Sequence, residues 1–186
     1  MNYNKIIKIV VLGLFMNPFL CYAQNVTDVK KHVLKEVEGL KENIHLICQK
    51  LWDYSEIALK EEKSAELLID NLKDEDFVIE KGVAGMPTAF VATYGSGKPV
   101  IGILAEYDAL PGVGNNVVPY REPRNDGNRN GQGCGHNLFG SACVNAAIAV
   151  KRMMVQYNIK GTVKLYGTPA EETVVGKVYM AKAGLF

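Results

Sequence analysis

Residues 99–111 read Pro-Val-Ile-Gly-Ile-Leu-Ala-Glu-Tyr-Asp-Ala-Leu-Pro, an apolar run that is followed by two acidic residues. The run from Pro99 to Ala105 is short and apolar throughout, which predicts a strand. Glu106 and Asp108 come directly after it. Because ligand sites in open α/β sheets form outside the carboxyl ends of strands, acidic side chains at this position indicate a functional site.

The hydrophobic pattern on either side of this stretch predicts further strands and helices. The strands are expected at Phe77 to Val83, Thr88 to Tyr94 and Gly161 to Thr168. The helices are expected at Asp28 to about Tyr54, Lys60 to Lys73, Asn137 to about Tyr157 and Lys177 to Ala183, with Thr27 or Asp28 as the first N-cap. Strands and helices alternate in the second half, which favours an α/β fold with helices packed on the faces of a sheet.

A long connection, residues 111–133, lies between the strand at Pro99 to Ala105 and the helix that follows. It is rich in glycine, asparagine and arginine and has no periodicity. A connection of this length inside a compact domain is usually functional or disordered. Its three arginines, Arg121, Arg124 and Arg129, either pair with a carboxylate of a substrate or are simply solvated.

The first 23 residues have the pattern of a signal peptide. Lys5 and Lys8 precede an apolar run from Ile9 to Leu20, which is followed by Cys-Tyr-Ala. The run is shorter than the roughly 20 residues of a membrane span. We therefore expect cleavage after Ala23, export to the periplasm or secretion, and no stable membrane association afterwards. Lipid attachment at Cys21 is the alternative.

The charges of the chain are balanced, with 21 basic and 20 acidic side chains and a formal net charge of +1. Such a balance does not favour binding to nucleic acid or to an anionic membrane surface, so a small molecule is the expected partner. Removal of the leader leaves Cys48, Cys134 and Cys143, and three cysteines cannot all pair with one another in an oxidising compartment. At least one of them stays free, binds a metal or pairs with another chain.

Metal-binding side chains occur in two further segments, one just past the long connection and one after the last strand. Cys134 and His136 offer a thiolate and an imidazole, and Glu171 and Glu172 offer carboxylates. These are the donor groups that zinc prefers. We expect Cys134, His136 and one glutamate as ligands, the other glutamate as the general base, and Asp108 as the residue that orients a ligand.

The same residues also have plainer interpretations. Cys134 taken alone suits a disulfide or a buried thiol equally well. Two glutamates at the start of a helix are often no more than a favourable interaction with the helix dipole. If a helix begins at Asn137, however, its positive end points towards Cys134 and favours the thiolate.

Five motifs in sequence order resemble metallopeptidase family 20, and within it the amidohydrolase branch. They are Gly-Val-Ala-Gly-Met-Pro-Thr-Ala-Phe (82–90), Gly-Ile-Leu-Ala-Glu-Tyr-Asp-Ala-Leu-Pro-Gly (102–112), Gly-Cys-Gly-His-Asn-Leu (133–138), Tyr-Gly-Thr-Pro-Ala-Glu-Glu (166–172) and Gly-Lys-Val-Tyr-Met (176–180). The resemblance implies part of a zinc-dependent aminopeptidase/carboxypeptidase-like catalytic domain, with a mixed sheet and helices on both faces. It also implies hydrolysis of an amide between an acyl or aminobenzoyl group and an amino acid such as glutamate.

The resemblance further implies a role for each residue of the site. Cys134, His136 and Glu172 fall on metal ligands, Glu171 on the general base and Asp108 on the supporting aspartate. Members of the family hold two divalent ions, zinc or manganese, and carry a smaller dimerisation domain.

The same resemblance implies that residues 24–186 are the amino-terminal portion of the catalytic domain. The family has two more histidine ligands beyond the glutamate pair, whereas no histidine follows His136 in this sequence. We therefore expect the dimerisation domain and the carboxy-terminal part to be absent, a homodimer only for the intact protein, and no activity of this chain alone. A non-catalytic remnant or binding module and a dipeptidase of the same family are the alternatives.

Overall fold

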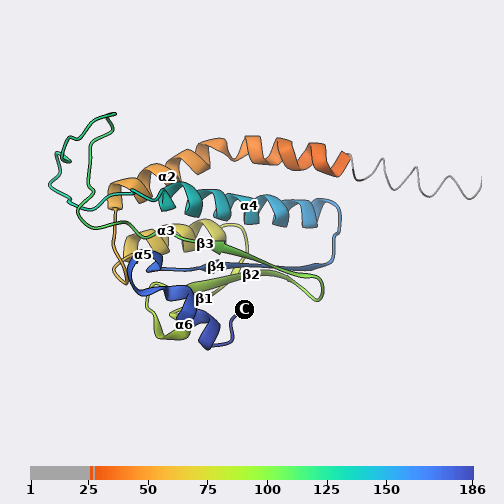
Figure 1. Cartoon of the computed structure of the whole chain (residues 1–186). Helices are drawn as coiled ribbons and strands as arrows, with labels where there is room; N and C mark the ends of the chain where they lie inside the picture. The colour runs from red at the N-terminus through yellow and green to blue at the C-terminus, as the bar shows by residue number, and fades with distance from the viewer. Residues whose placement is uncertain (1–25, 27) are drawn as a thin grey trace, which may run out of the picture.

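The computed structural model describes residues 26 and 28–186, whose centre is a four-stranded sheet with helices on both faces (Figure 1). The strands are β1 (Val78–Lys81), β2 (Phe90–Ser96), β3 (Val100–Ala105) and β4 (Gly161–Gly167). The structure confirms the α/β fold that the sequence pattern predicts and the mixed sheet that the family resemblance implies. The signal-peptide prediction falls outside the described residues.

The sheet has the strand order β1-β2-β4-β3, so β1 and β3 form its edges. β1 pairs with β2 and β2 pairs with β4 in antiparallel fashion, whereas β3 and β4 are parallel. Ala105 at the end of β3 lies opposite Gly167 at the end of β4. The segments that follow these two strands therefore leave the sheet side by side.

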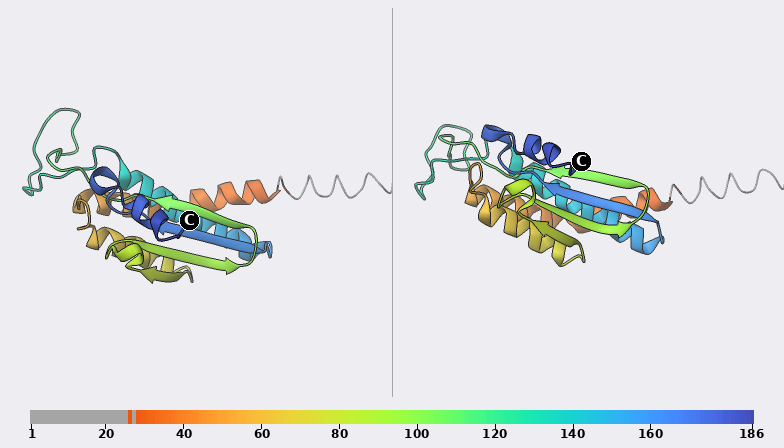
Figure 2. Two further views of the ribbon diagram at one scale, coloured as in Figure 1. Left: turned by 60° about the horizontal axis from the view of Figure 1, so that its bottom comes forward. Right: turned by 90° about the horizontal axis from the view of Figure 1, so that it is seen from below.

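Helices form layers on the two sides of the sheet. A helical stretch at 28–39 is followed by α2 (Lys41–Tyr54), α3 (Glu62–Lys73), η1 (Val83–Gly85), α4 (His136–Gln156), α5 (Glu171–Val174) and α6 (Gly176–Lys182). α2, α3 and α4 pack together on one face, and α6 lies on the other (Figures 1 and 2). α4 has the length and apolar composition of a membrane span, but half of its most apolar window is buried inside the protein, which is typical of a core helix.

Alternation along the strands divides the core between the two faces. Phe90 and Ala92 of β2 and Leu165 of β4 are buried in the main cluster under α2, α3 and α4. Val91 and Tyr166, their neighbours in sequence, point to the opposite face and join a smaller cluster with residues of α6 and the η1 region. This period of two is the expected consequence of pleated strands that are covered on both sides.

Most predicted elements are confirmed to within a few residues, but the structure corrects two expectations near the amino terminus. The first predicted helix is interrupted at Leu40, which forms a turn between the helical stretch and α2. Asp28 is itself helical, so it is not the N-cap. The alternative cap, Thr27, lies outside the described residues.

The long connection is ordered and forms the carboxyl-terminal cap of α2. Arg124 donates from Nη1 to Trp52 O at 2.8 Å and from Nη2 to Asp53 O at 3.0 Å. Its guanidinium also lies over the Trp52 ring, 4.4 Å from the ring centroid. Gln132 donates to Leu51 O at 3.2 Å. The last carbonyls of a helix have no partner within the helix, and the connection supplies these partners.

Candidate metal centre

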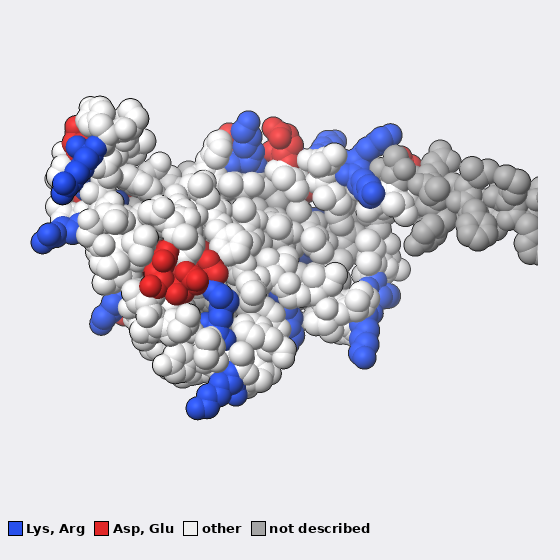
Figure 3. Space-filling model, in the orientation of Figure 1, with Lys and Arg blue, Asp and Glu red and all other residues white. Residues whose placement is uncertain are grey.

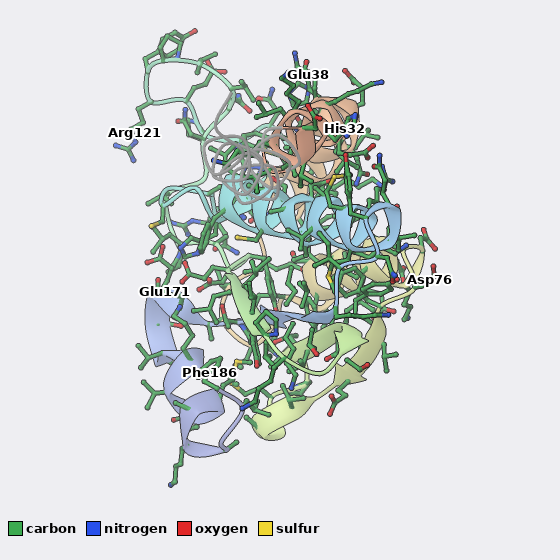
Figure 4. The ribbon with its side chains drawn as sticks, turned by 90° about the vertical axis from the view of Figure 1, so that its right-hand side faces the viewer. His32, Glu38, Asp76, Arg121, Glu171 and Phe186 are labelled. Carbon is green, nitrogen blue, oxygen red and sulfur yellow. The ribbon has the colours of Figure 1, made fainter. Side chains whose placement is uncertain are left out.

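Three segments meet where β3 and β4 end, as the sequence predicts. Glu106 and Asp108 follow β3, Glu171 and Glu172 open α5 after β4, and His136 opens α4 next to Cys134. Acidic side chains gather near α5 on the face shown in Figure 3, and Figure 4 marks Glu171 at the start of α5. The fold therefore brings together all five site residues that were expected from sequence.

His136 is fixed between two carboxylates. Its Nδ1 lies 3.0 Å from Asp108 Oδ1, and its Nε2 lies 3.0 Å from Glu106 Oε2. The His136 side chain is almost fully buried and that of Asp108 is completely buried. A carboxylate partner on one ring nitrogen fixes the orientation of the ring and directs the other nitrogen into the site, as in many metal-binding histidines.

Asp108 also holds the segment that carries the glutamates. Its Oδ2 accepts a hydrogen bond from the backbone N–H of Glu172 at 2.9 Å. Glu171 Oε2 and Glu172 Oε1 each lie 3.9 Å from His136 Nε2. One aspartate therefore sets the relative position of the histidine and of both glutamates.

The donor set fits a metal ion. Cys134, His136 and Glu172 offer donor atoms that lie within 4.8 Å of one another, and so do Glu106, His136 and Glu171. Glu172 Oε1 is buried and has no hydrogen-bond partner in the part of the chain that the structure describes, which is costly unless another group satisfies it. A thiol, an imidazole and carboxylate oxygens are the ligand types of zinc sites, and a divalent cation would satisfy this oxygen.

The electrostatics of the site follow from its excess of carboxylates. Burial opposes a charge on His136, but the hydrogen bond and the charge of Asp108, with Glu106 and Glu172, raise the pKa of its imidazole. The pKa of the Cys134 thiol is also raised, first by its hydrogen bond with Glu172. The nearby carboxylates thus act against the start of α4, which by itself favours the thiolate.

Two further residues of the site, Glu106 and Lys177, had no role predicted from the sequence. Glu106 contacts His136, and its Oε1 accepts a hydrogen bond from Lys177 Nζ of α6 at 2.5 Å. Glu106 is two residues from Asp108 along an extended segment, and this spacing was the available signal. Lys177 gave no such signal, since its contact depends on how α6 folds back over the sheet.

Several residues considered from sequence do not join the site. Arg124 is used to cap α2, and Figure 4 shows Arg121 on the long connection, away from Glu171. Cys48 and Cys143 are partly buried and form no disulfide with another described cysteine, and burial raises the pKa of Cys143 to about 11. His32 and His45 are exposed and lie outside the donor groups of the site.

A cavity of about 470 Å³ lies between the long connection and the end of α2, and its lining reaches Gly133. Trp52, Val113 and Pro119 supply apolar surface, and Asn115 and Asn116 supply polar groups. Gly133 directly precedes Cys134 in the sequence. The size falls within the range of small-molecule sites, roughly 300–1,000 Å³.

The sequence and the fold both match known metallopeptidases. The model of peptidase family M20/M25/M40 matches residues 102–186. The chain is 38% identical over 159 residues to one subunit of the p-aminobenzoyl-glutamate hydrolase of Escherichia coli (strain K12), a match that covers 86% of this chain and 33% of that protein. It is 26% identical over 170 residues to Xaa-Arg dipeptidase of Mus musculus, covering 85% of this chain and 36% of that protein.

A solved structure from Bacillus subtilis, described as a dinuclear metal binding peptidase from the M20 family, superposes with a TM-score of 0.66. The two sequences are 23% identical, and the match covers 80% of this chain and 40% of that chain. The likeness confirms the fold class. The chain spans about a third of the length of the curated relatives it matches.

Proposed function

Because this chain is a relative of the M20/M25/M40 peptidases, we propose that it forms the metal-binding part of a metal-dependent amidohydrolase. One observation carries the proposal. His136 is held by Asp108 beside the buried, unpartnered Oε1 of Glu172, with Cys134 within ligand distance of both. A divalent cation would satisfy this oxygen, and a single zinc or manganese ion is the simplest occupant.

The residues of the site have two kinds of role, binding the ion and transferring a proton. Cys134, His136 and Glu172 would hold the ion, which supplies Lewis-acid activation of water and of the amide carbonyl when bound. Asp108 fixes the ring of His136 through Nδ1 and so keeps Nε2 directed into the site. Glu171 is more exposed than Glu172, so its carboxylate is the better placed to accept a proton from water at the substrate side.

We assign the substrate class from the relatives and from the cavity beside the site. The E. coli relative is named as part of a p-aminobenzoyl-glutamate hydrolase, and the proposed substrate is an acyl or aminobenzoyl amide of an amino acid such as glutamate. The apolar walls formed by Trp52, Val113 and Pro119 suit a flat or aliphatic acyl group. The Mus musculus relative, an Xaa-Arg dipeptidase, makes a dipeptide the alternative substrate.

Assembly and location belong to the same proposal. The E. coli relative is named as one subunit of its enzyme, so a complex with a second, different subunit is an alternative to the homodimer that the family resemblance implies. The pattern of residues 1–23 supports export to the periplasm or secretion. Amino-terminal sequencing of the exported protein should give Gln24 as the first residue, whereas retention of the leader would contradict export.

Metal binding is the direct test, because it does not depend on turnover by a chain that spans a third of its relatives. Calorimetric titration of the chain with zinc and with manganese should show saturable binding. Cys134→Ser replaces a thiolate with a neutral hydroxyl and should weaken zinc binding by about tenfold or more. Cys143→Ser is the matched control, because Cys143 lies outside both donor groups and packs against the main core.

Absence of binding to the unsubstituted chain would contradict the metal centre. Binding without hydrolysis in a protein that includes the remaining length of the relatives would instead favour a non-catalytic binding module. Release of p-aminobenzoate from aminobenzoyl-glutamate, compared with cleavage of an Xaa-Arg dipeptide, separates the two substrate classes.

A further inference from the structure

Glu61 is a fully buried carboxyl group outside the candidate metal centre. It immediately precedes α3, is 0% exposed, and forms no ion pair among residues 26 and 28–186. Burial raises the pKa of Glu61, and the hydrogen bonds that it accepts act in the opposite direction. Burying a carboxyl group without a basic partner costs free energy. The hydrogen bonds that Glu61 accepts must offset this cost.

Those contacts reach the segment that carries the two glutamates of the site. Glu61 Oε1 accepts the backbone N–H of Ala170 at 2.9 Å. Ala170 is fully buried, precedes Glu171 and has a left-handed backbone with φ 58°. A residue other than glycine in this conformation is destabilised by about 1 kcal/mol, so the surrounding structure has to hold it there. The hydrogen bond from Glu61 does so.

The second oxygen of Glu61 connects, through Thr88, to the segment that follows β3. Glu61 Oε2 accepts a hydrogen bond from Thr88 Oγ1 at 3.0 Å. The carbonyl oxygen of Thr88 accepts a hydrogen bond from the buried Tyr107 hydroxyl at 2.6 Å. Tyr107 stands between Glu106 and Asp108 in the sequence. Glu61 is thus connected to both segments that present carboxylates to His136.

The turn at Ala170 is held from two sides. Glu61 binds the N–H of Ala170, and Asp108 binds the N–H of Glu172. Glu171 lies between these two fixed amides, with its side chain 3.9 Å from His136 Nε2. Loss of either hydrogen bond would leave the backbone that positions Glu171 and Glu172 less constrained.

We propose that Glu61 is a positioning residue, which locks the left-handed turn at Ala170 and so directs Glu171 and Glu172 towards His136. It does not touch the ion or the substrate and acts only through the backbone. The inference rests on the proposed metal centre, and it predicts that metal affinity depends on a side chain that is no ligand. Partners that orient ligands typically contribute about 10- to 100-fold to metal affinity.

The test compares Glu61→Gln with Glu61→Met. Glutamine keeps an acceptor for the N–H of Ala170, and its amide can donate to the Thr88 hydroxyl, whereas methionine has a similar volume and no such acceptor. Glu61→Met should weaken zinc binding by about tenfold or more, and Glu61→Gln should stay within about twofold of the unsubstituted chain. Glu62→Met is the matched control, since Glu62 is the exposed next residue and begins α3.

Two spectroscopic measurements separate positioning from a general loss of stability. In the cobalt-substituted chain, Glu61→Met should change the d–d absorption bands, because the Glu172 ligand shifts, while the thiolate charge-transfer band of Cys134 remains. Hydrogen exchange at the Ala170 amide should become faster in Glu61→Met and stay slow in Glu61→Gln. The exchange measurement needs no metal, so it tests the turn independently of the proposed function.

The possible results are distinct. If the unsubstituted chain binds zinc and Glu61→Met binds it equally well with the same cobalt spectrum, the inference is overturned and the metal centre stands. If the unsubstituted chain binds no metal, the metal centre is refuted, and exchange at the Ala170 amide alone decides whether Glu61 holds the turn. Should Glu61→Met not fold, Thr88→Val removes only the hydroxyl donor, and it should speed exchange at Ala170 and weaken zinc binding. No change in Thr88→Val would overturn the inference.

Discussion

At the scale of single residues, Asp108 shows how one buried carboxylate can organise a site. Its two oxygens bind different partners, the imidazole of His136 and the backbone N–H of Glu172. These partners come from α4 and from α5, which are separated by the whole of β4. The residue therefore couples the orientation of one proposed ligand to the position of another.

The two adjacent glutamates should differ in function although they are neighbours in sequence. Glu172 has a buried, unpartnered oxygen, and Glu171 is the more exposed of the pair. We expect Glu172→Gln to lose metal, because an amide oxygen is a weaker ligand than a carboxylate. Glu171→Gln should keep metal and lower turnover by about 100-fold or more, because it removes the proton acceptor.

Calorimetry measures metal binding, and release of p-aminobenzoate from aminobenzoyl-glutamate measures turnover in a protein that includes the remaining length of the relatives. Thr173 is the next residue on the same short helix and is exposed, so Thr173→Ser serves as the neutral control. Retention of both metal and activity in both glutamine variants would refute this division of roles.

Some residues of the site could be predicted from sequence and others could not. Asp108, Glu171 and Glu172 follow strands, and parallel neighbours such as β3 and β4 place their carboxyl ends together. The same reasoning cannot find Glu61, which lies before α3 and reaches the site only through tertiary hydrogen bonds. Local patterns report which side of an element is buried, whereas contacts of this kind depend on how distant elements pack.

At the scale of elements, the long connection and α2 depend on each other. Arg124 donates to two carbonyl oxygens at the end of α2 and stacks on the Trp52 ring. The sequence showed only an irregular segment that is rich in glycine and arginine. Its order could not be predicted, because the partners of Arg124 lie about 70 residues earlier in the chain.

Replacing Arg124 should destabilise the protein more than replacing any exposed arginine of the same connection. Arg124→Lys keeps the charge, but lysine cannot serve both carbonyl oxygens and the aromatic ring in one geometry. We expect a loss of about 1–3 kcal/mol in the free energy of unfolding, measured in urea. Arg121→Lys, at an exposed position of the connection, is the control and should change stability by less than about 0.5 kcal/mol. Equal stability of the two variants would show that the connection is not held by Arg124.

A cluster of opposite charges joins α4 to the turn after α3. Glu75 accepts hydrogen bonds from Arg152 at 2.5 Å and from Lys151 at 3.2 Å. Burial acts to raise the pKa of Glu75, but these two basic side chains outweigh it and the pKa is lowered. A carboxyl group with a lowered pKa in the folded state stabilises the protein above its unfolded pKa, and this contribution is lost as pH falls through the folded pKa.

Glu75→Gln should therefore be less stable than the unsubstituted chain at neutral pH, by about 1 kcal/mol or less because the cluster is partly solvated. The difference should begin to shrink as pH falls below the ordinary pKa of glutamate, about 4.3, and should vanish only below the lowered folded pKa, where both chains carry a neutral side chain. Urea unfolding at pH 7 and at pH 3.5 measures it. A difference that is independent of pH would assign the effect to packing and not to charge.

At the scale of the whole molecule, the two edges of the sheet are unequal. β1 carries Glu80 and Lys81, and charged side chains on an edge strand oppose pairing with another strand. β3 reads Val-Ile-Gly-Ile-Leu-Ala and has no charge. Val100 and Ile101 are 56% and 55% exposed, so this edge presents both apolar side chains and unpaired backbone groups.

The uncharged edge makes self-association the expected behaviour of the isolated chain at high concentration. Sedimentation velocity should show a sedimentation coefficient that rises with protein concentration, because β3 of one molecule is free to pair with another. Val100→Lys places a charge on this edge and should restore a constant, monomeric value. Val78→Lys is the matched control, since Val78 is an exposed valine on the β1 edge, which already carries charges. If Val78→Lys abolishes association to the same extent as Val100→Lys, net charge and not the β3 edge controls self-association. An unsubstituted chain that stays monomeric at every concentration would show that the β3 edge does not mediate self-association.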